Sequence, residues 1–125
     1  MNVARNFILV GSAYLILGVI LGMYMGGSGD HSLSILHAHI NLLGFTLMAV
    51  FGVVYKVFPA MAASGLARLH FWAHTVGSLV LLALLYLLLT GSIGEAAMMP
   101  LAPLSELLVL IGVVLFGYNA WKNLS

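Results

Sequence analysis

The chain contains no cysteine among its 125 residues. Disulfides, cysteine–zinc sites, iron–sulfur clusters, thiolate ligation of haem and covalent attachment of haem are therefore excluded. Charged residues are also scarce, at 6% of the sequence, whereas hydrophobic residues make up 63%. This balance excludes a disordered chain, argues against a soluble domain and leaves no basic patch for nucleic acid. Apolar sequence dominates, which indicates a membrane protein.

Four apolar stretches are long enough to cross a bilayer, which takes about 20 predominantly apolar residues. They lie at residues 7–24, 33–58, 69–89 and 104–121, and the connections contain glycine, serine or proline. The first stretch is long for a signal peptide and no cleavage signal stands out after it, so we expect a retained helix. The predicted fold is an all-α membrane protein, with one four-helix domain over residues 1–125.

The basic residues indicate how the chain is oriented. All of them fall on one side of a four-pass topology: Arg5, Lys56, Arg68 and Lys122. The positive-inside rule places that side, with both termini, in the cytoplasm. The acidic residues fall on the other side: Asp30, Glu95 and Glu106. We therefore expect a multi-pass protein of the cell inner (plasma) membrane.

The segment His37-Ala38-His39 lies near the start of the second apolar stretch. Ionisable side chains inside hydrocarbon are costly and mark a functional site by default. Two residues apart on a helix, the histidines point to nearly opposite sides, so they serve two sites or one site shared between helices. Asn41 lies one turn beyond His37, and Gly44 leaves room for a flat ligand against the backbone. The alternative is that each histidine only hydrogen-bonds a neighbouring helix.

The ligand types narrow the choice of cofactor. Neutral imidazole binds haem iron, copper and zinc, and the lack of carboxylates disfavours calcium and magnesium. Haem suits an apolar slot between helices, where histidines of different helices hold it from both faces. Non-covalent haem b is therefore favoured, with His37 and His39 as iron ligands. Copper is less favoured, at a group of soft ligands on the outer face: Met23, Met25, His31, Met98 and Met99.

The third stretch carries His70 and His74, which share one face of a helix. An antiparallel path places both toward the cytoplasm, and the helical rise separates His74 from His39 by about 12 Å in depth. That is too far to share one iron through bonds of about 2 Å. We expect His70 to be an interfacial residue beside Trp72. For His74, a packing hydrogen bond and a second site both stay open.

Several segments together resemble the C-terminal part of the catalytic subunit of haem–copper oxidases, with C-type oxidases and nitric oxide reductases most similar. The segments are His37-Ala38-His39, Leu43-Gly44-Phe45, Phe51-Gly52-Val53-Val54-Tyr55, Phe58-Pro59, Leu69-His70-Phe71-Trp72 and Thr75-Val76-Gly77. The resemblance covers about residues 35–90. It implies that His37 binds a high-spin haem, that His39 binds a low-spin haem and that His70 is not a ligand.

The chain lacks the helices that carry the family's copper ligands and its second low-spin ligand, so oxidase catalysis is not expected. The family fold has approximate threefold symmetry built from four-helix units, and this chain resembles the unit of helices nine to twelve. The resemblance therefore implies a homotrimer in which His37 of one subunit faces His39 of the next. Close helix packing would be allowed by Gly11, Gly18 and Gly22, and His31 is a candidate contact for the haem propionates.

The expected function is haem b binding in electron transfer, or in handling of haem or diatomic gases, with a respiratory redox partner. Two alternatives belong to other classes. One is a copper-binding membrane protein whose site lies on the outer face. The other is a cofactor-free assembly partner of a respiratory complex.

Overall fold

The computed structural model describes residues 1–124. Its elements are all helical over that range, and four of the spans they form are long and apolar enough to cross a membrane. The first, third and fourth spans are α1 (Val3–Ser28), α5 (Gly65–Leu89) and α6 (Leu101–Asn123). The second span consists of α2 (Ser34–His39), η1 (Ile40–Thr46) and α3 (Leu47–Val57). The short helices α4 (Pro59–Ala63) and η2 (Glu95–Met98) lie in the connections.

The four predicted spans are thus present, and two of them start four residues earlier than hydropathy indicated. The Asn2 side chain accepts the backbone N–H of Arg5 at 3.0 Å and caps α1. The Ser64 side chain accepts the N–H of Leu66 at 3.2 Å and caps α5. Caps satisfy amide groups that have no partner inside the helix, so a polar residue can set a start that lies outside the apolar stretch.

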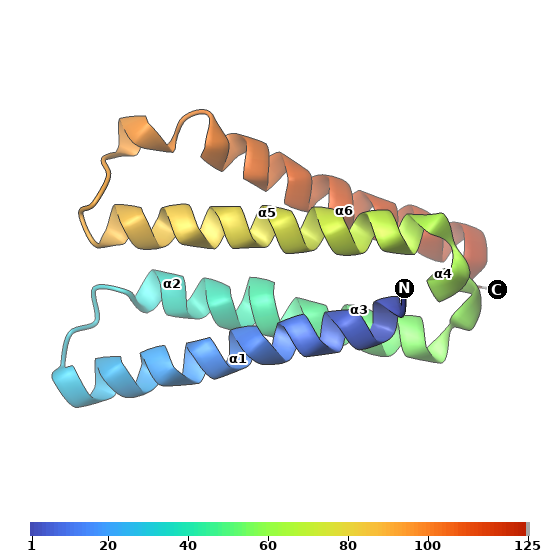
Figure 1. Ribbon diagram of the computed structural model, residues 1–125, viewed down its shortest axis with the longest axis horizontal. Coiled ribbons are helices and arrows are strands. Elements are labelled where there is room, and N and C mark those ends of the chain that lie inside the picture. The colour runs from blue at the N-terminus through green and yellow to red at the C-terminus, as the bar shows by residue number, and fades with distance from the viewer. Residues whose placement is uncertain (125) are drawn as a thin grey trace.

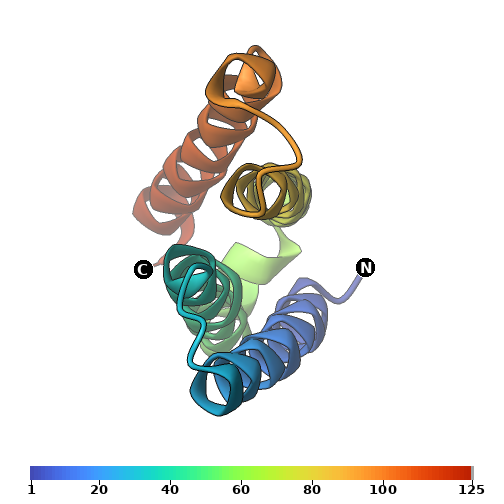
Figure 2. The ribbon, with the colours of Figure 1, turned by 90° about the vertical axis from the view of Figure 1, so that its left-hand side faces the viewer.

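The spans form two helical hairpins (Figures 1 and 2). α1 packs mainly against the second span, and α5 packs mainly against α6. Both termini and α4 lie at one end of the bundle, which we call the terminal end (Figure 1). The connections 29–33 and 90–100 lie at the opposite end, which we call the loop end. The helix ends that carry the four basic residues therefore gather at the terminal end.

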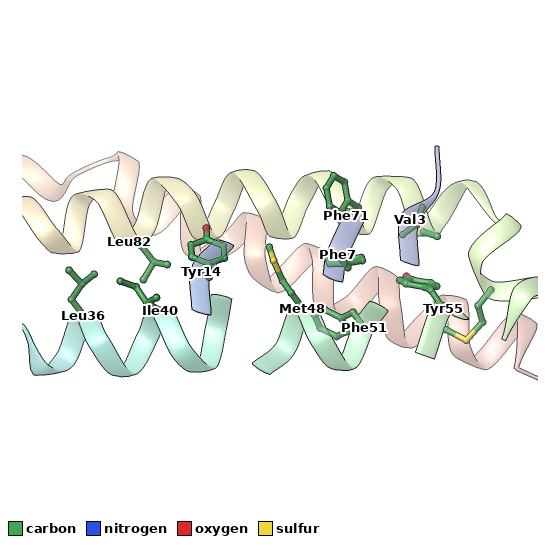
Figure 3. Close-up of a cluster of buried hydrophobic side chains, with 12 residues drawn as sticks. Val3, Phe7, Tyr14, Leu36, Ile40, Met48, Phe51, Tyr55, Phe71 and Leu82 are labelled. Atoms are coloured by element: carbon green, nitrogen blue, oxygen red, sulfur yellow. The ribbon is translucent and has the colours of Figure 1, made fainter. Parts of the chain in front are cut away.

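The two hairpins meet around Phe7, which is fully buried. Its ring centroid lies 5.5 Å from that of Phe51, on its own hairpin, and 5.0 Å from that of Phe71, on the other. Figure 3 shows these side chains in the terminal half, with Tyr14, Ile40 and Leu82 toward the loop end. Because lipid is as apolar as these residues, close packing rather than exclusion from water holds the hairpins together.

The second span is not a continuous α-helix, which the sequence did not lead us to expect. A π-helical segment occupies Ile40–Thr46, immediately after His39. The Thr46 hydroxyl donates to the carbonyl of Asn41, five residues earlier, at 2.8 Å. π-helical segments are rare and occur frequently at functional sites. The irregular part of the backbone therefore adjoins the histidine pair.

Candidate functional site

His39 is exposed on the surface of α2, and its own helix orients its ring. Its Nδ1 lies 2.8 Å from the carbonyl oxygen of Ile35, one turn earlier. A carbonyl only accepts hydrogen bonds, so Nδ1 carries the proton and Nε2 keeps a lone pair. Within residues 1–124 the structure gives this Nε2 no hydrogen-bond partner. Metal-bound histidines commonly donate their other N–H to a backbone carbonyl in this way.

A groove of about 400 Å³ adjoins His39. It runs along α2, η1 and the start of α3, and it is lined by Ala38, His39, Leu42, Leu43, Thr46 and Leu47. Apart from His39 and Thr46 these side chains are aliphatic, so the ring nitrogen stands at the edge of an apolar surface. An apolar, flat cofactor fits such a surface better than a hydrated ion does.

His37 points toward α1 of the same chain and is half-buried. The Asn41 amide donates through Nδ2 to His37 Nε2 at 3.1 Å, so the two residues share a side as predicted. A Cβ added at Gly22 would lie 3.0 Å from the same Nε2, which shows how closely the ring approaches α1. The lone pair of His37 is thus already used, and it is available to a metal only if Asn41 turns away.

The glycines of α1 allow close helix packing, as expected, and the packing partner is the second span of the same chain. A Cβ at Gly18 would collide with the Asn41 side chain, and one at Gly11 would lie 3.1 Å from Met48 Cβ. Asn41 Oδ1 is buried there without a hydrogen-bond partner among the described residues. The Asn41 amide is therefore held by steric contact as much as by its bond to His37.

The expected opening beside Gly44 is filled. A Cβ at Gly44 would lie 2.5 Å from Cγ of Tyr14, whose ring packs on the backbone there. The Tyr14 hydroxyl is 3.0 Å from the hydroxyl of Ser78, so this ring joins α1, η1 and α5. Gly44 thus makes room for a side chain of this protein, and the flat ligand that we expected at this point has no space.

The prediction that His70 is interfacial is wrong. Its ring is fully buried, and Nδ1 lies 2.9 Å from the Tyr55 hydroxyl of α3. The rings of Phe7 and Phe51 lie 4.9 Å and 4.4 Å from it. The earlier start of α5 moves His70 further along the span, and it faces the other hairpin, while the neighbouring Trp72 is exposed.

His74 also lies in the interior, one turn beyond His70, and it makes the packing hydrogen bond that we considered. Its Nε2 lies 2.9 Å from the carbonyl oxygen of Leu43, so Nε2 carries the proton. Its Nδ1 is buried without a partner among residues 1–124. His74 bonds the π-helical segment from one side, while the exposed ring of His39 stands at its start. The structure therefore does not bring these two histidines together.

The soft ligands at the loop end do not converge. Met25 is buried whereas Met23 and Met99 are exposed, and His31 bonds the carbonyl of Gly29 through Nδ1 at 3.0 Å. No group of three or more histidine or acidic side chains that would suit a metal ion exists within residues 1–124. A bare ion such as zinc commonly takes four ligands, whereas haem needs only axial ones from the protein.

Sequence reasoning missed three buried polar contacts between elements. They are the bond between Tyr14 and Ser78, the bond between Tyr55 and His70, and the bond from Asn119 Nδ2 of α6 to the carbonyl of Met61 at 3.0 Å. A polar side chain inside an apolar stretch was the available signal for all three. Comparison with protein-family models, curated proteins and solved structures finds no match.

Proposed function

We propose that this protein binds haem b within the membrane, with His39 as one axial ligand and His37 of a neighbouring copy as the other. The observation that carries the proposal is the His39 ring. Its proton is fixed on Nδ1 by Ile35, its Nε2 is unpartnered within residues 1–124, and it borders an apolar groove. The sequence resemblance to the haem-binding helix of haem–copper oxidases supports the same pair of residues.

The residues of the site fit haem unequally. His39 is already oriented for ligation, and the groove beside it offers an apolar surface to a macrocycle. His37 requires the Asn41 amide to release Nε2 and also requires its ring to turn away from α1, because a Cβ at Gly22 would lie 3.0 Å from Nε2. Bound haem with both axial positions filled would supply one-electron transfer, and a diatomic gas would bind only if one of the two histidines left the iron. The protein would orient the imidazoles and keep water away.

The proposed assembly is a homotrimer in the inner (plasma) membrane with both termini in the cytoplasm. The four basic residues support the orientation because their helix ends gather at the terminal end (Figure 1). Because the chain has no cysteine, a Ser92→Cys variant tests the orientation directly. A membrane-impermeant maleimide should label it in intact cells. Labelling only after lysis would contradict this orientation.

Haem ligation is tested on protein purified in detergent, by the ratio of haem to chain and the reduced spectrum. The unmodified protein should show a sharp Soret band of low-spin haem. His39→Ala and His37→Ala should each abolish the low-spin spectrum because each removes an axial nitrogen. Ser32→Ala is the control, since this exposed loop residue does not line the groove beside His39, and it should leave the spectrum nearly unchanged. Full haem content in the double variant lacking His37 and His39 would refute the proposal.

A further inference from the structure

Two adjoining cavities open between the hairpins in the loop half of the bundle, away from the groove of His39. One has a volume of about 560 Å³ and an apolar lining that includes Ile20, Leu36, Leu82 and Ala83. The other has about 520 Å³ and a polar lining that includes Asp30, Ser32 and Thr90. Four residues line both cavities, which makes them continuous: Leu21, Tyr24, Leu33 and Tyr86. Each volume lies within the range of small-molecule sites, about 300–1,000 Å³.

The inner cavity suits a hydrocarbon chain and little else. Its one polar group toward the bundle centre is the hydroxyl of Tyr14, which is already paired with Ser78 at 3.0 Å. The other side chains that line it are aliphatic, apart from the tyrosines at its mouth. A polar ligand group placed there would lose its hydrogen bonds to water and gain none, which is unfavourable.

The outer cavity has the character of a cation site. Asp30 accepts the backbone N–H of Ser32 at 3.0 Å, and this bond lowers the pKa of the Asp30 carboxyl, which is therefore ionised at neutral pH. Tyr24 and Tyr86 add aromatic rings, which attract ammonium groups through their faces. The four lysines and arginines lie near the helix ends at the far end of the bundle, and the basic side chain close to Asp30 is His31 of the same loop.

We propose that the continuous cavity binds a membrane lipid with an ammonium head group, its head beside Asp30, Tyr24 and Tyr86 and one acyl chain in the apolar cavity. The inner part of the cavity is apolar and the outer part is polar, just as such a lipid has apolar acyl chains and a polar head group. The lining of the apolar cavity comes from α1, the second span and α5, and it includes the exposed side chains of Leu17, Ile20 and Leu79.

Native mass spectrometry of the protein in detergent tests this proposal with three lipids of identical acyl chains. Phosphatidylethanolamine and phosphatidylcholine carry the ammonium group, whereas phosphatidylglycerol does not. We expect the protein to bind the first two lipids about fivefold more tightly than the third. A ratio of this size corresponds to the combined free energy of an exposed ion pair and one cation–π contact. Equal retention of all three lipids, or preference for phosphatidylglycerol, would overturn the proposal.

Variants locate the binding within the molecule. Asp30→Asn should remove the preference for ammonium lipids, whereas Glu95→Gln, at the same end but outside both cavities, should keep it. Ala83→Phe fills the apolar cavity and should reduce retention of every lipid. Val114→Phe adds the same bulk on the exposed face of α6 and should not. If Asp30→Asn keeps the full preference for ammonium lipids and Glu95→Gln also keeps it, the assignment of the head group to the outer cavity is wrong.

Discussion

Tyr55 and His70 show how one pair of atoms can tie two hairpins together inside a membrane. The Tyr55 hydroxyl and His70 Nδ1 are 2.9 Å apart, and both side chains are almost completely buried. Removal of the Tyr55 hydroxyl leaves His70 Nδ1 without this partner in apolar surroundings, which is unfavourable. The strength of this pair is therefore measurable by a single substitution.

We expect Tyr55→Phe to lower the free energy of unfolding by about 0.5–2 kcal/mol, the range for buried hydrogen bonds in membrane proteins. Titration with a denaturing detergent in mixed micelles measures the change. Tyr118→Phe is the control because Tyr118 is about half exposed and belongs to no hydrogen bond given by the described residues. Equal losses for the two variants would mean that the bond to His70 contributes nothing specific.

At the level of whole elements, α1 and the second span are held in register by glycines that face large side chains. Gly18 faces Asn41, Gly22 faces His37, and Gly44 faces Tyr14. Each glycine lies opposite a polar or aromatic residue of the partner helix. The position of the His37 ring thus depends on α1 as well as on α2.

Gly18→Ala should destabilise the fold by about 1–3 kcal/mol because its Cβ would collide with Asn41. Because the collision would displace the Asn41 amide from His37 Nε2, the protein that still folds should bind haem at least as well as the unmodified protein. Gly117→Ala is the matched control: a Cβ there meets nothing within 4 Å, so stability should stay the same or rise slightly. The two variants are compared by detergent titration and by the ratio of haem to chain. Wild-type stability of Gly18→Ala would contradict the observed packing of α1.

The positions of the four spans along the sequence were predictable, whereas the side chains that face the inside of the bundle were not. Hydropathy locates a membrane helix because its length and composition are local properties, and all four spans were found this way. It does not show which face is internal, so His70 was expected to be an interfacial residue beside Trp72 although it faces Phe7 and Phe51. The π-helical segment at Ile40–Thr46 was also not predicted, and it contacts Tyr14 and His74 of other helices. Neither contact leaves a pattern in the local sequence.

For the whole molecule, the directions of the two candidate ligands bear on the number of subunits. Within one chain His37 faces α1, while His39 faces outward beside its groove. Because these two rings point to different sides of the chain, a haem held by both kinds of histidine would need its second ligand from another subunit, which we propose is a second copy. A cyclic arrangement pairs unlike surfaces at every contact, and the threefold symmetry of the resembling family favours a ring of three.

We therefore expect native mass spectrometry to show three chains with three haems. Mixing His37→Ala chains with His39→Ala chains should restore part of the low-spin spectrum, because some contacts of a mixed ring regain both ligands. Each variant alone serves as the control and should stay without low-spin haem. A haem-loaded monomer, or mixtures with no recovery, would contradict the ring.

The cluster around Phe7 also has a consequence for how the protein is made. His70 and His74 belong to the second hairpin, but much of what covers them, Phe7 and Phe51, belongs to the first. The first hairpin is synthesised before the second, so Phe7 and Phe51 are already in the membrane when His70 and His74 are inserted. A second hairpin that fails to dock leaves these two imidazoles without that cover, which is costly wherever they face lipid.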